Sequence, residues 1–569
     1  MGGGLAGCFA AVRARELNAS VTLVEKNFTG KTGWSHYAGV IMLFNEKWGD
    51  DIEAWVDEYS RVWEYLVDRR WAEGLLRESY HRYRDMVSWG IPFTDKEGKI
   101  GYPDPEKDPR KPLTRLKSKY RYTLNRVDFG KKWEKMLLAR KKVIESGCNV
   151  LDRVMITDLL RHDGRVVGAV GFHTRNGDFY VIKAKATVIA TGGMHFRGAA
   201  YGRQFTTGDG QAMAYRAGGE LMNMEFGGLF YVAKQCDSVV IDGTLFLPPQ
   251  IVERDRTTNA YGEEFLNGNP GLVTTVLWPI EVHAGRGPIY HEPFGIDREP
   301  YKEEIKRSEK NAELPCITML DRAGIDIFKD RIEQYVAFMG TSESGAGLRI
   351  NDKSETNVMG LYAAGNSSGD SLGAANYSAG TGMMKASVTG YRAGENAAKY
   401  AKRIGNVEID GSEIEKYREI IFAPLNRKGG YTTDHVLTRI QQTIFPYEVH
   451  MVMHEKRLQA ALTMIEFFRD HFIPKMTASD IHDLRKAHEV RNMVLGAEMM
   501  LRAAIVRTES RGWFYREDYP RRDDENWLKW IVLKEETGEM KIWTVPVQKE
   551  YWGDTSMPYE KRYPLNYER

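Results

Sequence analysis

The glycine pattern at the start of the chain constrains its fold most. Gly2, Gly4 and Gly7 have the G-x-G-x-x-G spacing, which lets a backbone turn tightly, approach a pyrophosphate and continue into a helix whose N-terminus holds the anion. Apolar residues then recur at helical spacing, and a short strand-like segment ends at Glu25. An acid at the end of the second strand accepts hydrogen bonds from the ribose hydroxyls of an adenosine. These features predict a dinucleotide site in a doubly wound α/β domain.

A buried strand precedes the glycine loop in units of this kind, whereas here only Met1 does. That strand lies in the middle of the parallel sheet, so its absence would expose neighbouring strands and weaken nucleotide binding. We therefore expect a shortened version of a protein with roughly ten or more further N-terminal residues, enough for one strand and its lead-in.

Length and composition favour a globular protein of several domains. The chain has 569 residues, of which 42% are apolar and 28% are charged. The 80 basic residues are nearly balanced by 78 acidic ones, so the chain has no large net charge that would attract nucleic acid. No stretch approaches the ~18 uninterrupted apolar residues of a membrane helix, and the start lacks the regions of a signal peptide. We expect a cytoplasmic protein without a membrane span or a nucleic-acid partner.

The cysteines argue against a metal centre. Cys8, Cys148, Cys236 and Cys316 lie far apart, with no C-x-x-C pair and no His cluster at zinc spacing. We expect no metal and no iron–sulfur cluster in this chain, and reduced thiols typical of a reducing compartment.

The predicted cofactor domain is discontinuous. Its first part spans 1–225, with a helical and basic insertion at 41–130, and its second part spans 345–405. Residues 226–344 mix short strands, prolines and turns, which predicts an inserted α+β domain. Residues 406–569 show helical periodicity and predict a C-terminal helical domain.

Within the insertion, residues 110–126 carry a run of Arg and Lys after a proline-rich stretch and predict a loop. Two interpretations stay open. The run is either a solvated basic face or a docking patch for an acidic electron carrier or an anionic substrate.

Further glycine-rich segments would bring the backbone close to a cofactor. An apolar strand ends in Thr191, Gly192 and Gly193, and a later strand ends in the loop 364–366 before a long helix. Asp209 opens a helix after Gly208, so it is either an N-cap or a ribose ligand.

Together these motifs resemble the FAD-binding and capping-domain signatures of fumarate reductase and succinate dehydrogenase flavoprotein subunits. The segments that carry this resemblance are 2–25, 190–193, 207–210, 285–288 and 360–365. Within that superfamily the closest resemblance is to the alpha subunit of dissimilatory adenylylsulfate reductase. It rests on residues 259–264, 338–347, 422–427 and 515–520.

The resemblance implies a Rossmann-like FAD domain of the glutathione-reductase type, a capping domain over the isoalloxazine and a C-terminal helical domain. Noncovalent FAD is expected, because Thr32 stands where many relatives attach FAD through a His. The residues that the resemblance assigns to FAD are Gly2, Gly4, Gly7, Glu25, Lys26, Thr32, Gly33, Thr191, Gly192, Gly193, Asp209, Gly365, Asn366, Ser378, Gly380 and Thr381.

The substrate site departs from the family pattern. Fumarate reductases bind a dicarboxylate with a His before "MGG" and an Arg in a "GANRLG" loop, but Val336 and Tyr377 stand at those places. Succinate and fumarate are therefore not the expected substrates. Adenylylsulfate reductase uses a His where this chain has Ser342, and residues 225–237 offer no Arg for its capping-domain position.

The remaining catalytic candidates are Tyr377, then His291 and Arg286. The resemblance places Tyr377 in the loop beside the flavin, where a phenol can donate a hydrogen bond or a proton. Arg286 has a second interpretation as a brace of the capping domain, and His291 as a structural loop residue.

We expect an FAD-dependent oxidoreductase that moves a hydride between flavin N5 and a small, anionic organic or sulfur-containing substrate held between the FAD and capping domains. Because the chain lacks cluster ligands, electrons would pass to an iron–sulfur subunit or another separate carrier. Two alternatives stay open: adenylylsulfate reductase itself, with His291 or His283 replacing the missing His, and a catalytically silent flavoprotein subunit. The sequence leaves homo- and hetero-oligomeric assembly open.

Overall fold

The computed structural model describes most of the chain. The described residues are 1–31, 33–94, 100–101, 114–117, 123–129, 132–198, 205–234, 256–266, 275–293, 295–303, 305–306, 320–341, 345–369, 380–563, 565 and 567. Among the residues named above, Thr32, Cys236, Cys316, Ser342, Tyr377 and Ser378 lie outside this set.

Parallel strands form the base of the cofactor domain, which confirms the predicted α/β fold class. β1 (Thr22–Glu25) pairs in parallel with β7 (Asn149–Asp152), and β11 (Thr187–Ile189) pairs in parallel with β18 (Leu361–Ala363). Met1 and Gly2 link the two pairs. The Met1 ammonium donates to the Val188 carbonyl and the Met1 carbonyl accepts the Ala190 N–H, while the Gly2 N–H donates to the Val24 carbonyl of β1, all at 2.8 Å. The carboxyl ends of these strands therefore meet at one edge, where ligands of such sheets bind.

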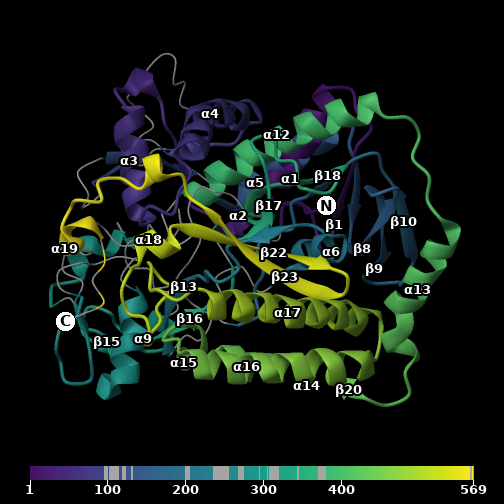
Figure 1. Ribbon diagram of the computed structural model, residues 1–569. Coiled ribbons are helices and arrows are strands. Elements are labelled where there is room, and N and C mark those ends of the chain that lie inside the picture. The colour runs from purple at the N-terminus through teal and green to yellow at the C-terminus, as the bar shows by residue number, and fades with distance from the viewer. Residues whose placement is uncertain are drawn as a thin grey trace.

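Two helices pack backbone to backbone over this sheet. α1 (Leu5–Glu16) follows the glycine loop, and α12 (Thr381–Arg403) runs along the top of the molecule in Figure 1. Gly390 and Gly394 face α1, and a Cβ added to them would lie 2.4 Å from the Ala6 oxygen and 2.2 Å from the Ala10 oxygen. The close approach of α12 to α1 therefore depends on these glycines.

An antiparallel sheet follows in the chain. Its strands are β8 (Val154–His162), β9 (Arg165–His173) and β10 (Phe179–Lys183). The β8–β9 turn places Asp163 at φ 49° and Gly164 at φ 75°, the left-handed region that this Asp-Gly pair enters readily.

The predicted insertion at 41–130 and the residues that flank it contain helices and a small sheet. The elements of this region are α2 (Trp34–Tyr37), β2 (Val40–Met42), α3 (Ile52–Val62), α4 (Arg69–Ser88), β3 (Phe93–Thr94), β4 (Ile100–Gly101), β5 (Thr114–Lys117), β6 (Thr123–Phe129) and α5 (Lys132–Glu145). The predicted loop at 110–126 is wrong for its described part, since β5 and β6 pair as an antiparallel hairpin. Thr, Leu and Val recur there among Lys and Arg, which is a strand pattern. The many charged residues favoured a loop instead. The basic side chains of this segment, and with them the predicted docking patch, lie outside what the structure describes.

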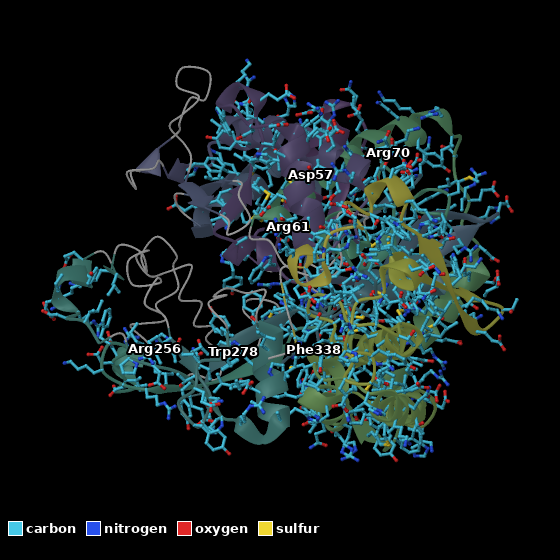
Figure 2. The ribbon with its side chains drawn as sticks, turned by 60° about the vertical axis from the view of Figure 1, so that its left-hand side comes forward. Asp57, Arg61, Arg70, Arg256, Trp278 and Phe338 are labelled. Atoms are coloured by element: carbon cyan, nitrogen blue, oxygen red, sulfur yellow. The ribbon has the colours of Figure 1, made fainter. Side chains whose placement is uncertain are left out.

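The capping part is an antiparallel sheet with the strand order β13-β16-β15-β14. Its strands are β13 (Leu229–Ala233), β14 (Thr257–Thr258), β15 (Ile289–His291) and β16 (Ile332–Phe338), and α9 (Leu277–Glu281) lies beside them. In Figure 2 its labelled residues Trp278 and Phe338 lie below α3, which carries Asp57 and Arg61.

The C-terminal part is helical as far as residue 506. Its main helices are α13 (Gly411–Asn426), α14 (Thr433–Ile444), α15 (Tyr447–His450), α16 (Glu455–Phe467) and α17 (Ile481–Val506), of which α14, α16 and α17 form a layer in Figure 1. The Asp480 side chain caps α17 by accepting the Asp483 N–H at 2.7 Å.

Beyond residue 506 the structure differs from the predicted helical domain. β22 (Lys529–Glu536) and β23 (Glu539–Pro546) form a hairpin that joins the sheet β19-β17-β12-β22-β23. The apolar run at 530–533, the Thr537-Gly538 turn and the alternation in β23 are the signals for this hairpin. The remaining short elements are β12 (Leu221–Met222), β17 (Gly347–Arg349), β19 (Ser368–Gly369), α6 (Asp209–Arg216), β20 (Tyr431–Thr432), β21 (Met476–Thr477), α18 (Asp524–Trp527) and α19 (Tyr559–Arg562).

Buried arginines hold the segment between α17 and this hairpin. Arg507 pairs with Glu225 at 2.9 Å and with Glu509 at 2.8 Å, and Arg511 pairs with Glu509 at 2.7 Å. These side chains are fully buried, so each charge depends on its partner for compensation. Arg507 thereby ties this segment to the residues just before the capping sheet.

Two negative findings concern the described residues only. None of the helices there is both long enough and apolar enough to cross a bilayer. No group of three or more His, Cys, Asp or Glu side chains suited to a metal ion occurs in the same part of the chain.

Candidate cofactor and active site

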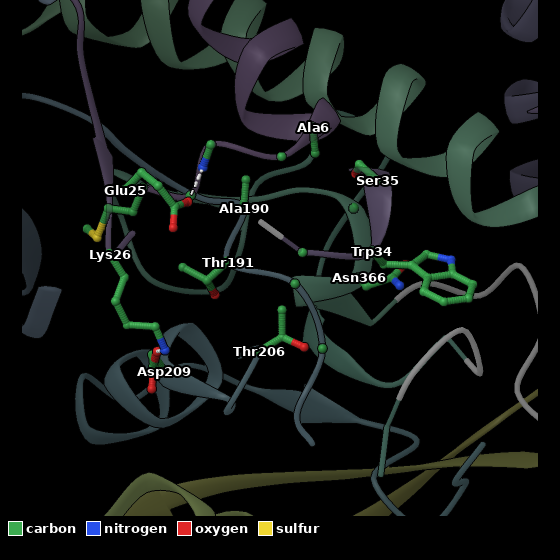
Figure 3. A pocket seen from close by; sticks show the side chains of 18 of the residues that line it. Ala6, Glu25, Lys26, Trp34, Ser35, Ala190, Thr191, Thr206, Asp209 and Asn366 are labelled. Carbon is green, nitrogen blue, oxygen red and sulfur yellow. Dashed lines mark hydrogen bonds and ion pairs between the residues drawn. The ribbon is translucent and has the colours of Figure 1, made fainter. Parts of the chain in front are cut away.

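One pocket collects most of the residues that the sequence assigns to the cofactor. It lies where the carboxyl ends of β1, β11 and β18 meet the N-termini of α1 and α12 (Figure 3). The predicted residues that line it are Gly2, Gly4, Glu25, Lys26, Gly33, Thr191, Gly192, Gly193, Asp209, Gly365 and Asn366.

The glycine loop forms the floor of the pocket. Gly2 has φ 96°, and a Cβ at this position would lie 2.2 Å from the Ala190 carbonyl oxygen. Gly7 does not line the described pocket, and its expected pyrophosphate contact stays a prediction. A Cβ on Gly7 would lie 1.9 Å from the Gly2 oxygen, so this glycine lets α1 pack against the loop.

Two helix N-termini point into the pocket. α1 begins after Gly4, which has no side chain to cap it, and the Leu5 N–H donates to the Ser35 hydroxyl at 3.2 Å. α12 begins after Gly380, again without a side-chain cap, and its residues Gly382 and Met383 line the pocket. Uncapped first turns carry N–H groups and partial positive charge, which suit the phosphates of a dinucleotide.

The Glu25 carboxylate organises the loop. It accepts the Gly3 N–H at 2.7 Å and the Asn27 N–H at 2.9 Å, and the residue is only 9% exposed. The sequence also predicts a ribose contact for this carboxylate. Glu25 therefore fixes the glycine loop in addition to its predicted role.

A second loop closes the opposite wall. The Gln211 amide donates to the Gly192 carbonyl at 2.9 Å, and the Ser367 hydroxyl donates to the same oxygen at 3.2 Å. These bonds tie the segment after β11 to the loop after β18. Figure 3 shows Asn366 of that loop at the same end of the pocket as Trp34, far from Lys26.

The capping sheet joins this wall directly. β16 runs into Thr341, whose N–H donates to the Met194 carbonyl at 2.9 Å, while the Met194 N–H donates to the Thr341 hydroxyl at 3.2 Å. A Cβ on Gly193 would lie 2.3 Å from the Thr341 oxygen. The end of β16 thus lies against the pocket residues Gly193 and His195.

Residues 1–230 match the family described as FAD binding domain, and residues 439–563 match the family described as fumarate reductase flavoprotein C-term. The chain belongs to the fumarate reductase and succinate dehydrogenase flavoprotein superfamily. Its cofactor is FAD, and it is a flavin-dependent oxidoreductase. The glycine floor and the two uncapped helix ends fit this cofactor on the geometry of the chain alone.

Relatives of this flavoprotein match it over nearly its full length. One subunit of the CoM/CoB fumarate reductase of Methanothermobacter marburgensis is 28% identical over 560 residues, which cover 94% of this chain and 96% of the relative. An E. coli quinol fumarate reductase structure has a TM-score of 0.81 at 20% identity, covering 99% and 97% of the two chains. Adenylylsulfate reductase from Archaeoglobus fulgidus has a TM-score of 0.78 at 23% identity, covering 96% and 95%. At these identities the two solved structures establish the fold.

Some predicted FAD residues do not line the flavoprotein's described pocket. Gly380 and Thr381 instead form the start of α12, where the Thr381 hydroxyl lies 2.9 Å from the Tyr59 hydroxyl. Thr32 and Ser378 lie outside the described residues and stay predictions.

Several pocket residues were missed by sequence reasoning. They include Trp34, Ser35, Met155, His195 and Thr206. The His195 ring contacts the Thr206 hydroxyl through Nδ1 at 2.5 Å, which holds the ring against the pocket wall. His195 follows the predicted glycine pair by two residues, and that spacing is the only signal that pointed to it.

The predicted catalytic residues stay predictions. Tyr377 lies outside the described residues. Arg286 forms a two-pronged ion pair with buried Glu281, at 2.7 Å from Nε and 2.9 Å from Nη2, an arrangement that favours the bracing role. His291 is buried in β15 opposite Thr257 and Ile332.

Proposed function

We propose that this flavoenzyme transfers a hydride between flavin N5 and a small, anionic organic or sulfur-containing substrate held between the FAD and capping parts. The observation that carries the proposal is the contact of Thr341 with Met194, which brings the end of β16 against the wall of the cofactor pocket. A substrate between these surfaces would face both the cofactor and the capping sheet. When bound, FAD supplies the two-electron chemistry.

Aromatic rings support the exclusion of water at this junction. Phe338 at the end of β16 stacks on His450, with ring centroids 4.6 Å apart and planes 3° apart. Tyr231 of β13 stacks on Trp278 of α9 at 4.9 Å. These apolar surfaces would strengthen any electrostatic contact that the substrate makes there. Tyr377 and His291 are the proposed proton donors.

One described position lacks the His with which fumarate reductases bind a dicarboxylate. Val336, at the place of the family's His, is buried in β16, and its N–H donates to the Tyr447 hydroxyl at 2.7 Å. This supports a substrate other than succinate. The relative from Methanothermobacter marburgensis is named a fumarate reductase, so fumarate belongs in the test.

The test is reoxidation of the photoreduced enzyme under anaerobic conditions. Flavin absorbance is followed while enoates including fumarate, and keto acids, are each added to the photoreduced enzyme. In a parallel assay sulfite with AMP is added to the oxidised enzyme, because this pair donates electrons to the flavin. We expect one class of anion to change the redox state of the flavin at a saturable rate. Silence across the panel would contradict hydride transfer and favour a catalytically silent subunit, and turnover of AMP with sulfite would favour adenylylsulfate reductase.

We further propose that FAD is noncovalent and that electrons pass to a separate carrier or iron–sulfur subunit. Support for the carrier comes from the four dispersed cysteines and from the relative in Methanothermobacter marburgensis, which is named as one subunit of its enzyme. The proposed domain limits remain 1–225 with 345–405 for FAD, 226–344 for the cap and 406–569 for the C-terminal part.

A further inference from the structure

A buried cluster of charges joins α17 to the FAD pocket. We call Lys26, Arg197, Asp209, Arg485 and Glu489 the α17 cluster. The Glu489 carboxylate is fully buried and accepts hydrogen bonds from Lys26 at 2.8 Å, from Arg197 at 2.6 Å and from Arg485 at 2.6 Å. Glu489 is therefore the common partner of the three cations in the cluster.

Lys26 carries the connection to the pocket. Its ammonium also donates to the Asp209 carboxylate at 2.8 Å, and Figure 3 shows this pair at the end of the pocket that holds Glu25. Asp209 is held from α17 as well, since the Asn492 amide donates to its other oxygen at 2.9 Å. Lys26 and Asp209 line the pocket, whereas Glu489 and Asn492 do not. Two side chains of α17 thus hold two side chains of the cofactor wall.

The charges of the cluster depend on Glu489. Burial alone raises the pKa of Glu489, but the neighbouring Lys26, Arg485 and Arg197 lower it to about 2. With Glu489 ionised, three cations face two carboxylates. Without its charge only Asp209 would balance them, and the buried repulsion would displace Lys26.

We propose that Glu489 is a positioning residue for the FAD site. By holding Lys26 and Arg197, α17 fixes the Lys26–Asp209 wall beside the adenosine half of FAD. FAD binding and the packing of α17 on the cofactor domain are therefore linked, and each strengthens the other. The role concerns cofactor binding and does not depend on which substrate the enzyme uses.

The first test compares E489Q with E498Q by fluorescence titration of the apoprotein with FAD. Glu498 is a matched control, because it lies on the same helix, is buried and pairs with Arg469 at 2.6 Å and Arg502 at 2.9 Å. We expect E489Q to weaken FAD binding at least tenfold and E498Q to leave it within twofold. Equal effects of the two variants, or unchanged binding in E489Q, would overturn the proposal.

The second test asks whether Glu489 acts through Lys26. In the K26M background, E489Q should change FAD affinity less than threefold, and E489D in the native background should restore part of the loss. If E489Q still weakened FAD binding tenfold in the K26M background, Glu489 would not act through Lys26.

The third test measures the reciprocal effect by hydrogen exchange. FAD should slow the exchange of α17 amides around residues 485–492 in the native protein and not in E489Q. If E489Q does not fold, N492L removes the bond to Asp209 while Lys26 still pairs with that carboxylate at 2.8 Å. It also removes the acceptor of Arg216 Nη1, which keeps its ion pair with Asp158. N492L should weaken FAD binding several-fold. The linkage between α17 and FAD binding would be overturned if N492L bound FAD with native affinity and FAD did not slow the exchange of α17 amides.

Discussion

Glu25 shows how one side chain both builds the cofactor site and is expected to bind the cofactor. E25Q keeps its size but removes the charge that accepts the Gly3 and Asn27 N–H groups. Hydrogen bonds to a charged group contribute about 1.5–3 kcal/mol, so we expect FAD affinity to fall about tenfold or more, measured by calorimetric titration of the apoprotein. E16Q is the control, because Glu16 is half exposed on α1 and pairs only with Arg13 among the described residues. An E25Q protein with native affinity would contradict this role.

Noncovalent attachment is tested on the denatured protein. The described His nearest to Thr32 in sequence is His36, which is buried with its Nδ1 3.2 Å from the Gly30 carbonyl and does not line the pocket. We expect acid precipitation to release all the FAD, leaving no fluorescence in the protein band of a denaturing gel. A fluorescent band would identify a covalent link.

At the residue scale, the sequence predicted the site residues whose roles depend on their neighbours in the chain. The glycine loop and Glu25 could be found because their roles follow from spacing within one βα unit. Ser35 and His195 reach the same pocket from other segments, and the only local signal for either is the two-residue spacing of His195 from the glycine pair. Glu489 enters the cluster from a helix at the other end of the chain, so only the tertiary structure reveals it.

The contact between α1 and α12 supports a prediction at the scale of elements. An added Cβ on Gly390 or Gly394 would lie within 2.4 Å of a backbone oxygen of α1, so the helices must separate. We expect G390A and G394A each to destabilise the protein by about 1–3 kcal/mol and to weaken FAD binding, since both helix N-termini face the pocket. Thermal unfolding and FAD titration check this. G411A is the control, because nothing lies within 4 Å of its added Cβ, and equal stability of all three variants would refute the contact.

Element types were predicted where one periodicity dominates. The turn at Asp163-Gly164 and the N-cap at Asp480 follow such local rules, because each residue type has a specific role there. The β22–β23 hairpin was missed because its alternation follows a long helical region and is interrupted by charged residues. Its pairing with β12 at Leu221 depends on a strand that is distant in sequence.

At the scale of the whole molecule, two buried histidines make stability depend on pH. Burial lowers the pKa of His450 to about 3 and that of His488 to about 4. Between pH ~6.5 and about 4 the unfolded chain protonates both rings and the folded chain does not, so stability falls as the pH falls. The expected loss is about 1.4 kcal/mol per pH unit for each ring.

The measurement is thermal unfolding between pH 7 and 5. H450F should lower the dependence on pH, since it removes one ring whose pKa burial lowers, while His488 and His36, whose pKa values burial also lowers, remain. H435L is the control, because His435 is exposed on α14. A native pH dependence in H450F would show that other groups set it.

The described cysteines do not suit an iron–sulfur cluster, so electrons should leave the flavin through a separate carrier. Cys8 and Cys148 are free thiols, and burial raises the pKa of Cys8 to about 12 and raises that of Cys148. A thiol that keeps its proton is a poor iron ligand, because metals bind the thiolate. We expect the purified chain to hold one FAD and no stoichiometric iron or acid-labile sulfide, so that substrate-driven turnover requires an added acceptor. Iron and sulfide in cluster ratio on the chain itself would contradict a separate carrier, and C8S with C148S would then show whether these thiols hold it.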